Sequence, residues 1–185
     1  MSDAAASKMK NENEPVLLHA GRHLRLMRRG RWEYVDRPVA AGAAVIIAVT
    51  EAGKLVLIEQ FRPPVNARTI ELPAGLTGDV QGTEGEAFSA AARRELREET
   101  GYEATDLIHH FTVPSCAGLT AEMVAFFEAT GIHKADAGGG VEGENIVVHE
   151  VALGDVEDWL KKQMDGGLMI DPKVYTGLWL LRKRF

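Results

Sequence analysis

Three glutamates crowd one short stretch of the chain, since Glu95, Glu98 and Glu99 lie within "AARRELREETGY", residues 91–102. At positions i, i+3 and i+4 of a helix, their side chains share one face. Like charges at this spacing destabilise a helix by roughly a few tenths of a kcal/mol. Either neighbouring arginines offset that cost, as on an ordinary salt-bridged surface, or the carboxylates hold a hard cation such as Mg²⁺ or Mn²⁺.

The residues around these carboxylates favour the cation. From Glu86 to Tyr102 the chain reads E-x7-R-E-L-x-E-E-x-G-Y. This resembles the signature of the Nudix hydrolases, G-x5-E-x7-R-E-U-x-E-E-x-G-U with U aliphatic or aromatic, and it matches from Glu86 onward. The resemblance implies that the glutamates share the charge of divalent cations and a diphosphate.

The leading glycine of that signature departs from the pattern, because its position holds Val80. Gly75 in "ELPAG" is the natural equivalent, with Gly78 and Gly82 as alternatives. With Gly75 in that role, the loop over 76–85 carries an insertion of five residues. A longer loop is tolerable, because closing it costs little extra entropy.

The resemblance implies a role for each charged residue of the helix. Glu95 and Glu99 correspond to the main metal ligands, and Glu98 to a ligand or a water-positioning residue. Arg94 corresponds to the arginine that orients the catalytic glutamates. Glu86 corresponds to the outermost glutamate of the signature, which is structural or a peripheral ligand.

Two segments outside the helix complete the implied metal site. In related pyrophosphatases the backbone carbonyl at the position of Ala74 also ligates a metal. A glutamate from the loop "GVEGENI" is expected as general base, with Glu144 as ligand or base and Glu142 as alternate base. The flanking glycines over 138–140 would let this loop close over a substrate. The alternative is a solvated acidic loop.

Other stretches indicate which diphosphate is cleaved. "IEQFRPPV", "TIELPAG" and "WEYVDR" resemble the ADP-ribose and nucleoside diphosphate sugar pyrophosphatase branch of the Nudix family. This implies Mg²⁺-dependent hydrolysis of ADP-ribose or a related sugar to a nucleoside monophosphate and a sugar phosphate. The alternatives are a Nudix pyrophosphatase for a dinucleotide or nucleoside triphosphate, and a sensor that binds nucleotide sugars without hydrolysing them. The intact carboxylate set argues against a sensor.

Candidate substrate contacts lie ahead of the helix. Trp32 either packs in the core or stacks on a base, which is worth about 1–3 kcal/mol. The resemblance supports stacking, with Glu33 and Arg37 near the base edge. Arg62 is either a surface ion pair or a diphosphate contact, for which its planar fork is suited. Glu71 is expected as a hydrogen-bond partner or a supporting group behind the site.

The loop "PSCAGLT", residues 114–120, matches a segment that often reads S-P-G in ADP-ribose enzymes. Gly118 keeps the glycine as a substrate-binding candidate, but Ala117 replaces the proline. Other nucleoside diphosphate sugars, such as GDP-mannose, therefore stand beside ADP-ribose as substrates. Cys116 has no base paired with it and is expected to be a small buried filler.

The elements that must position these residues follow from the apolar pattern. Strands are expected over 43–50, 54–62, 105–113, 121–129 and 146–153, a short strand and turn over 68–75, and a β-hairpin over 23–37. Helices are expected over 86–100, 155–164 and 171–184, the first ended by Gly101 and the later two with an aspartate near their start. The resemblance makes this an α+β fold, a Nudix α/β/α sandwich with a mixed β-sheet and a short N-terminal β-hairpin region.

The 185 residues suit one such domain, and the formal charge of -6 argues against bulk nucleic-acid binding. We expect a disordered leader over 1–14, an N-terminal β region over 15–40 for dimerisation and base binding, and the Nudix hydrolase domain over 41–185. The resemblance implies a homodimer. A single cysteine and the lack of a signal peptide or membrane span predict a cytoplasmic protein.

Overall fold

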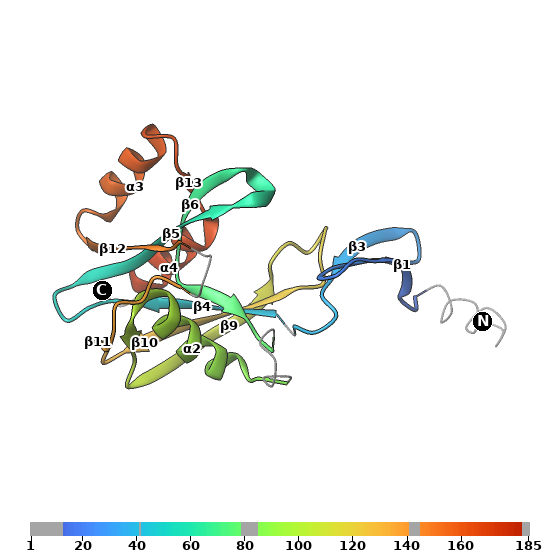
Figure 1. Cartoon of the computed structure of the whole chain (residues 1–185), viewed down its shortest axis with the longest axis horizontal. Coiled ribbons are helices and arrows are strands. Elements are labelled where there is room, and N and C mark those ends of the chain that lie inside the picture. The colour runs from blue at the N-terminus through green and yellow to red at the C-terminus, as the bar shows by residue number, and fades with distance from the viewer. Residues whose placement is uncertain (1–12, 41, 79–84, 141–144, 183–185) are drawn as a thin grey trace.

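The computed structural model describes residues 13–40, 42–78, 85–140 and 145–182 (Figure 1). The strands are β1 Val16–Ala20, β2 Arg25–Arg29, β3 Trp32–Asp36, β4 Gly42–Ala48, β5 Lys54–Arg62, β6 Ala67–Glu71, β7 Ala74–Leu76, β8 Tyr102–Glu103, β9 Asp106–Pro114, β10 Met123–Thr130, β11 His133–Lys134, β12 Val147–Ala152 and β13 Met169–Ile170. The helices are the short 3₁₀ turn η1 Pro63–Val65 and the α-helices α2 Phe88–Thr100, α3 Val156–Asp165 and α4 Pro172–Arg182. The leader expected over 1–14 falls outside the described residues, except for positions 13 and 14.

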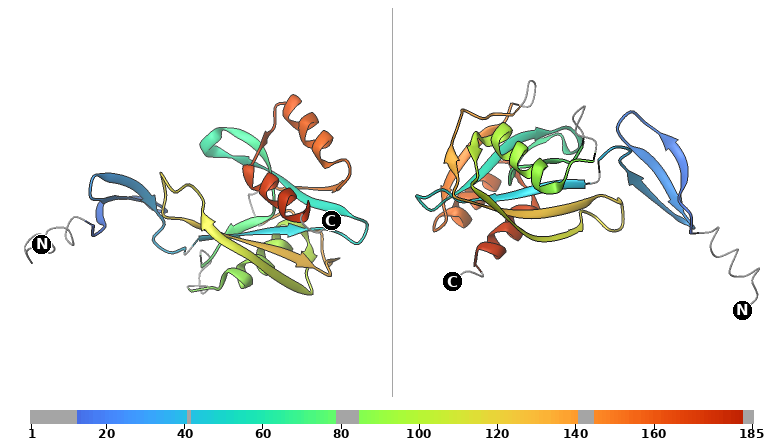
Figure 2. Two further views of the ribbon diagram at one scale, coloured as in Figure 1. Left: turned by 180° about the vertical axis from the view of Figure 1, so that it is seen from behind. Right: turned by 90° about the horizontal axis from the view of Figure 1, so that it is seen from below.

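Two four-stranded sheets form the body, in the orders β7-β4-β10-β9 and β12-β5-β6-β13. In the first, β10 runs parallel to β4 and antiparallel to β9; in the second, β13 runs parallel to β6 while β5 runs antiparallel to it. Both sheets are therefore mixed. Helix α2 lies on one side of the sheets and α3 and α4 lie on the other (Figures 1 and 2).

Alternation along β4 explains this layering. Val45 and Ile47 point into the apolar cluster shared with α3 and α4, whereas Ile46 points into the cluster shared with α2. Ala92 and Leu96 supply the α2 side of that second cluster. Because successive side chains of a strand face opposite ways, one apolar run supports helices on both faces. The predicted α+β fold, an α/β/α sandwich with mixed sheets, is confirmed.

The predicted strands over 43–50, 54–62, 105–113, 121–129 and 146–153 correspond to β4, β5, β9, β10 and β12. The segment over 68–75 divides into β6 and β7 around Pro73, which has no N–H to continue a ladder. Asp171 directly precedes α4, near the predicted start, and its carboxylate accepts the Lys173 N–H at 2.7 Å. Asp155 precedes α3 but makes no side-chain capping bond.

The expected hairpin over 23–37 is formed by β2 and β3, and β1 adds a third strand to it. This three-stranded sheet projects from the body (Figures 1 and 2). Its β3 edge is tied to the loop before β10, where the Val35 N–H donates to the Leu119 carbonyl at 2.8 Å and the Ala121 N–H donates to the Val35 carbonyl at 3.1 Å. None of the described helices is long and apolar enough to cross a membrane.

Candidate active site

Arg94 lies at the centre of the carboxylate cluster on α2. Its Nη1 donates to Glu95 Oε1 at 2.7 Å and to Glu98 Oε2 at 3.1 Å. Its Nε and Nη2 donate to the Glu86 carboxylate at 3.3 and 3.2 Å, and Nη2 also reaches the Leu76 carbonyl at 3.0 Å. Although burial opposes it, hydrogen bonding to Glu86 and the charge of Glu95 raise the pKa of Arg94 above its ordinary value. A fixed cation thus offsets three of the carboxylates.

Glu99 is held by the backbone of β7. Its side chain is buried, with 4% of the residue exposed, and its Oε2 accepts the Ala74 N–H at 2.9 Å. The next residue, Gly75, lies against Glu95, because an added Cβ there would fall 1.9 Å from Glu95 Oε1. Any larger residue here would displace the Glu95 carboxylate, which supports Gly75 as the displaced leading glycine of the signature. Gly78 instead donates its N–H to Glu86 Oε2 at 3.2 Å.

The donor set at this junction of α2 and β7 fits a hard divalent cation. Glu95, Glu98 and Glu99 would supply carboxylate oxygens, and Ala74 would supply a backbone carbonyl from the strand that Glu95 and Glu99 contact. In the described part of the chain, no group of three or more His, Cys, Asp or Glu side chains is arranged to hold a metal ion by itself. Mg²⁺ does not require such a group, since it keeps waters and takes phosphate oxygens as ligands. Glu142 and Glu144 lie outside the described residues.

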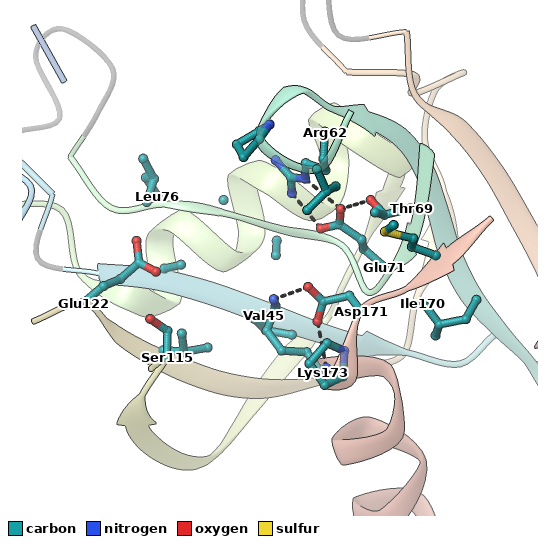
Figure 3. Close-up of a pocket in the computed structure, with 18 of the residues that line it drawn as sticks. Val45, Arg62, Thr69, Glu71, Leu76, Ser115, Glu122, Ile170, Asp171 and Lys173 are labelled. Atoms are coloured by element: carbon teal, nitrogen blue, oxygen red, sulfur yellow. Dashed lines mark hydrogen bonds and ion pairs between the residues drawn. The ribbon is translucent and has the colours of Figure 1, made fainter. Parts of the chain in front are cut away.

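A cleft of about 510 Å³ runs along β7 (Figure 3). Ala74, Gly75 and Leu76 line it, so β7 is shared by the cleft and the carboxylate helix. Val45 and Val124 are apolar residues of the cleft lining, which also contains polar side chains. These polar side chains are Arg37, Arg62, Thr69, Glu71, Ser115, Glu122, Asp171 and Lys173.

Arg62 and Glu71 face each other across neighbouring strands at one wall of the cleft (Figure 3). Arg62 Nε and Nη2 donate to the two oxygens of Glu71 at 2.7 and 2.6 Å, and the Thr69 hydroxyl also donates to that carboxylate. Glu71 is only 3% exposed. Its hydrogen bond raises the pKa of Arg62, and the charges of Glu99 and Asp171 add to the effect. Arg62 is thus both an ion-pair member and a cleft residue, with Glu71 supporting it.

The N-terminal candidates divide between the cleft and the surface. Arg37 lines the cleft and donates to Glu122 Oε1 at 2.8 Å. Trp32 is 58% exposed, so the core-packing alternative for it is wrong. Its Nε1–H donates to the Gly118 carbonyl at 3.1 Å, which brings together two residues predicted separately. Glu33 is exposed beside Trp32 and does not line the cleft.

The prediction that Cys116 is buried is wrong, because its side chain is exposed. The Cys116 carbonyl accepts the N–H groups of Leu119 and Thr120 at 2.9 and 3.0 Å, forming a tight turn. This turn directs the loop toward the N-terminal sheet, so the small side chain of Cys116 lies in an exposed turn and does not fill the core.

Five polar cleft residues were not anticipated as site residues: Thr69, Ser115, Glu122, Asp171 and Lys173. The Asp171 N–H donates to the Ile70 carbonyl at 2.9 Å, which places the start of α4 beside the strand that carries Glu71. The Lys173 Nζ contacts Asp171 Oδ2 at 2.5 Å. Aspartate at the start of the last helix was visible in the sequence, but its place in the cleft depends on the pairing of β13 with β6.

Comparison with known proteins finds a family model and several relatives that are similar to this chain. The NUDIX domain family model matches residues 39–165. An ADP-ribose pyrophosphatase of Bacillus subtilis (strain 168) is 37% identical over 97 residues, 52% of this chain and 48% of that protein. A GDP-mannose pyrophosphatase of Enterobacter sp. (strain 638) is 33% identical over 141 residues, 72% of this chain and 70% of that protein.

Two further matches are a relative with a different described role and a solved structure of low sequence identity. A methanol dehydrogenase activator of Bacillus methanolicus is 30% identical over 123 residues, 66% of this chain and 64% of that protein. The chain thus spans less than two thirds of this activator and of the Bacillus subtilis protein. A solved structure described as an ADP compounds hydrolase has a TM-score of 0.68 at 19% identity, covering 92% of this chain and 90% of that one. That likeness shows a shared fold.

Proposed function

The chain belongs to the NUDIX domain family, and from that premise we propose that it hydrolyses the diphosphate bond of ADP-ribose and related nucleoside diphosphate sugars. The products are a nucleoside monophosphate and a sugar phosphate. The observation that carries the proposal is β7, which contacts the carboxylates of α2 and also lines a cleft containing Arg62 and Lys173. The names of the pyrophosphatase relatives support the same substrate class.

The proposed cofactor is Mg²⁺, with Mn²⁺ as the alternative. Glu95, Glu98, Glu99, the Ala74 carbonyl and Glu144 would hold it. Bound there, the ion would neutralise charge on the diphosphate and lower the pKa of a water molecule.

The chain's own side chains have separable roles. Arg94 orients Glu95 and Glu98 through the hydrogen bonds of its Nη1. Arg62 offers its remaining N–H groups to the diphosphate, because Glu71 occupies only one edge of the guanidinium. Glu144 or Glu142 takes the proton of the attacking water as general base.

Base recognition is assigned to the N-terminal β region, residues 15–40. The bond from Trp32 to Gly118 fixes one edge of the indole and leaves much of the ring exposed to stack on a base. Glu33 and Arg37 lie on the same segment, Glu33 at the surface and Arg37 in the cleft, and would contact the edge of such a base. Residues 41–185 then form the hydrolase domain.

The test is product formation from ADP-ribose, GDP-mannose and UDP-glucose with Mg²⁺, followed by separating the nucleoside monophosphate from the sugar phosphate. We expect cleavage of at least one of them, lost on adding EDTA. A dinucleotide and a nucleoside triphosphate belong in the same panel. Cleavage of only those two contradicts the substrate class, and tight binding of a nucleotide sugar without turnover contradicts an enzymatic role.

We also propose that the protein is a homodimer joined through its N-terminal sheet. Val16 and Leu26 are 45% and 38% exposed on one face of this sheet, and Leu17 is 52% exposed on the other, so both faces carry apolar side chains that a second copy could cover. Sedimentation at micromolar concentration should give twice the 20.2 kDa chain mass. Leu17→Asp should shift the protein to monomer, whereas Ile108→Asp on β9 should not. A monomeric wild-type protein contradicts this proposal.

A further inference from the structure

The carbonyl groups in the last turn of α2, which carries Glu98 and Glu99, all accept hydrogen bonds from protein groups. An α-helix leaves about four terminal carbonyl groups without partners inside the helix. Here the Arg97 carbonyl accepts the Gly101 N–H at 2.8 Å, and Gly101, which was predicted to end the helix, has the left-handed conformation. The Thr100 carbonyl accepts the Lys134 Nζ at 2.6 Å.

The two carbonyls between these belong to the carboxylate residues themselves. The Glu98 carbonyl accepts the Gly140 N–H at 2.9 Å, and the Glu99 carbonyl accepts the Gly139 N–H at 2.8 Å. All four terminal carbonyls of the helix therefore have a protein partner, and three of those partners come from residues 134–140. We call residues 134–140 the C-terminal clamp.

Gly138 of the clamp and Gly101 at the end of α2 allow the backbones of the two segments to lie in close contact. A Cβ on Gly138 would lie 2.3 Å from the Thr100 carbonyl carbon, and a Cβ on Gly101 would lie 2.2 Å from the Asp136 carbonyl oxygen. Both glycines also have positive φ angles, +66° and +69°. The run over 138–140 was expected to act as a hinge, but its backbone is hydrogen-bonded to the helix.

The side chains of Asp136 and Lys134 make further contacts between the clamp and the end of α2. Arg97 Nε donates to Asp136 Oδ2 at 3.2 Å, and Asp136 Oδ1 accepts the Gly138 N–H at 3.0 Å. The Lys134 Nζ lies 4.7 Å from the centre of the Tyr102 ring, a cation–π contact. Its charge also lies at the negative end of the α2 dipole, where a cation is stabilising.

We propose that the C-terminal clamp is a positioning device for the metal-binding carboxylates, an inference that rests on the proposed function. Glu98 and Glu99 lie within the last turn of α2, the part of a helix that frays. Fraying would move the Glu99 carboxylate away from the Ala74 N–H that it meets at 2.9 Å. By supplying partners to the Glu98 and Glu99 carbonyls, the clamp holds both carboxylates toward β7.

The clamp is tested with two variants of different severity. Lys134→Met removes the ammonium group that donates to the Thr100 carbonyl, and because Lys134 is exposed the fold should tolerate the change. Lys134→Arg restores a donor and a positive charge and is the conservative variant. Gly138→Ala places a methyl group against the α2 backbone. The matched controls are Lys161→Met on α3 and Gly154→Ala, where an added Cβ would have no atom within 4 Å.

Two readouts need no substrate. The amide protons of Gly139 and Gly140 should exchange faster in Lys134→Met and Gly138→Ala, and Mn²⁺ titrated into the free protein should bind about ten- to a hundredfold more weakly. Lys134→Arg and both controls should match the wild type. Faster exchange with unchanged Mn²⁺ affinity would make the clamp merely structural and overturn the proposal, as would unchanged exchange in a folded Gly138→Ala variant.

Because these readouts need no substrate, they test the clamp proposal separately from the proposed hydrolase activity. If the wild type cleaves no nucleotide sugar, the substrate assignment fails, yet Mn²⁺ affinity still reports whether the clamp positions the carboxylates. If the wild type is active, Lys134→Met should raise the Mg²⁺ concentration for half-maximal rate by a similar factor, with the rate at saturating Mg²⁺ changed less.

Discussion

Glu99→Gln is expected to lower kcat/KM by about a hundredfold or more while leaving the fold intact. The substitution keeps the shape of a side chain that is 4% exposed. The new amide oxygen can still accept the Ala74 N–H, which the Glu99 carboxylate meets at 2.9 Å. What is lost is the negative charge, and with it most of the affinity of this site for a divalent cation.

The measurement is the steady-state rate over a Mg²⁺ titration, with the melting temperature recorded on the same samples. Glu51→Gln is the matched control, because Glu51 is an exposed glutamate in the turn between β4 and β5. Near-normal rates for Glu99→Gln would refute its assignment as a metal ligand. A large fall in melting temperature would instead show that the charge is needed for the fold.

Arg94→Met is expected to reduce the free energy of unfolding by about 3 kcal/mol, because it leaves Glu86 and Glu95 without their cation in a largely buried cluster. The Arg94 side chain is 19% exposed, and those of Glu86 and Glu95 are 10% and 11% exposed. Saturating Mg²⁺ should restore part of this loss, since a bound metal would take up some of the same charge.

Urea unfolding with EDTA and with Mg²⁺ separates these effects. Arg93→Met is the matched control on the neighbouring position, where the side chain is 46% exposed and donates to the Ala104 carbonyl at 2.7 Å. It should lose much less stability and show no extra Mg²⁺ dependence. An equal loss for Arg94→Met in EDTA and in Mg²⁺ would mean that the metal does not share the carboxylates with Arg94.

The carboxylate site could be predicted from the sequence because its main parts lie on one helix. The spacing of Glu95, Glu98 and Glu99 places them on one face whatever the rest of the fold does. The apolar run of β4 likewise predicted a strand buried on both faces, since that depends on local composition. Arg62 could be located at the end of β5 for the same reason.

The far wall of the cleft could not be predicted in this way. Asp171 and Lys173 reach it only because β13, two residues long, pairs with β6. So short a strand has no periodicity to detect. The clamp was misread for a related reason, because glycine predicts conformational freedom from sequence but also permits close contact, and only the fold distinguishes the two.

The mixed first sheet has a consequence for synthesis of the chain. Its inner strand β4 pairs in parallel with β10, so that Val45 lies opposite Phe126. A nascent chain must therefore carry the apolar β4 run, without that neighbour, until the ribosome has passed β10 and the chain can close a long loop. Sheets whose paired strands are far apart in the sequence fold slowly, and until they form, unpaired apolar strand edges are exposed and can aggregate. The same parallel pairing that places β4 between β7 and β10 therefore leaves the β4 edge open to aggregation until β10 has been synthesised.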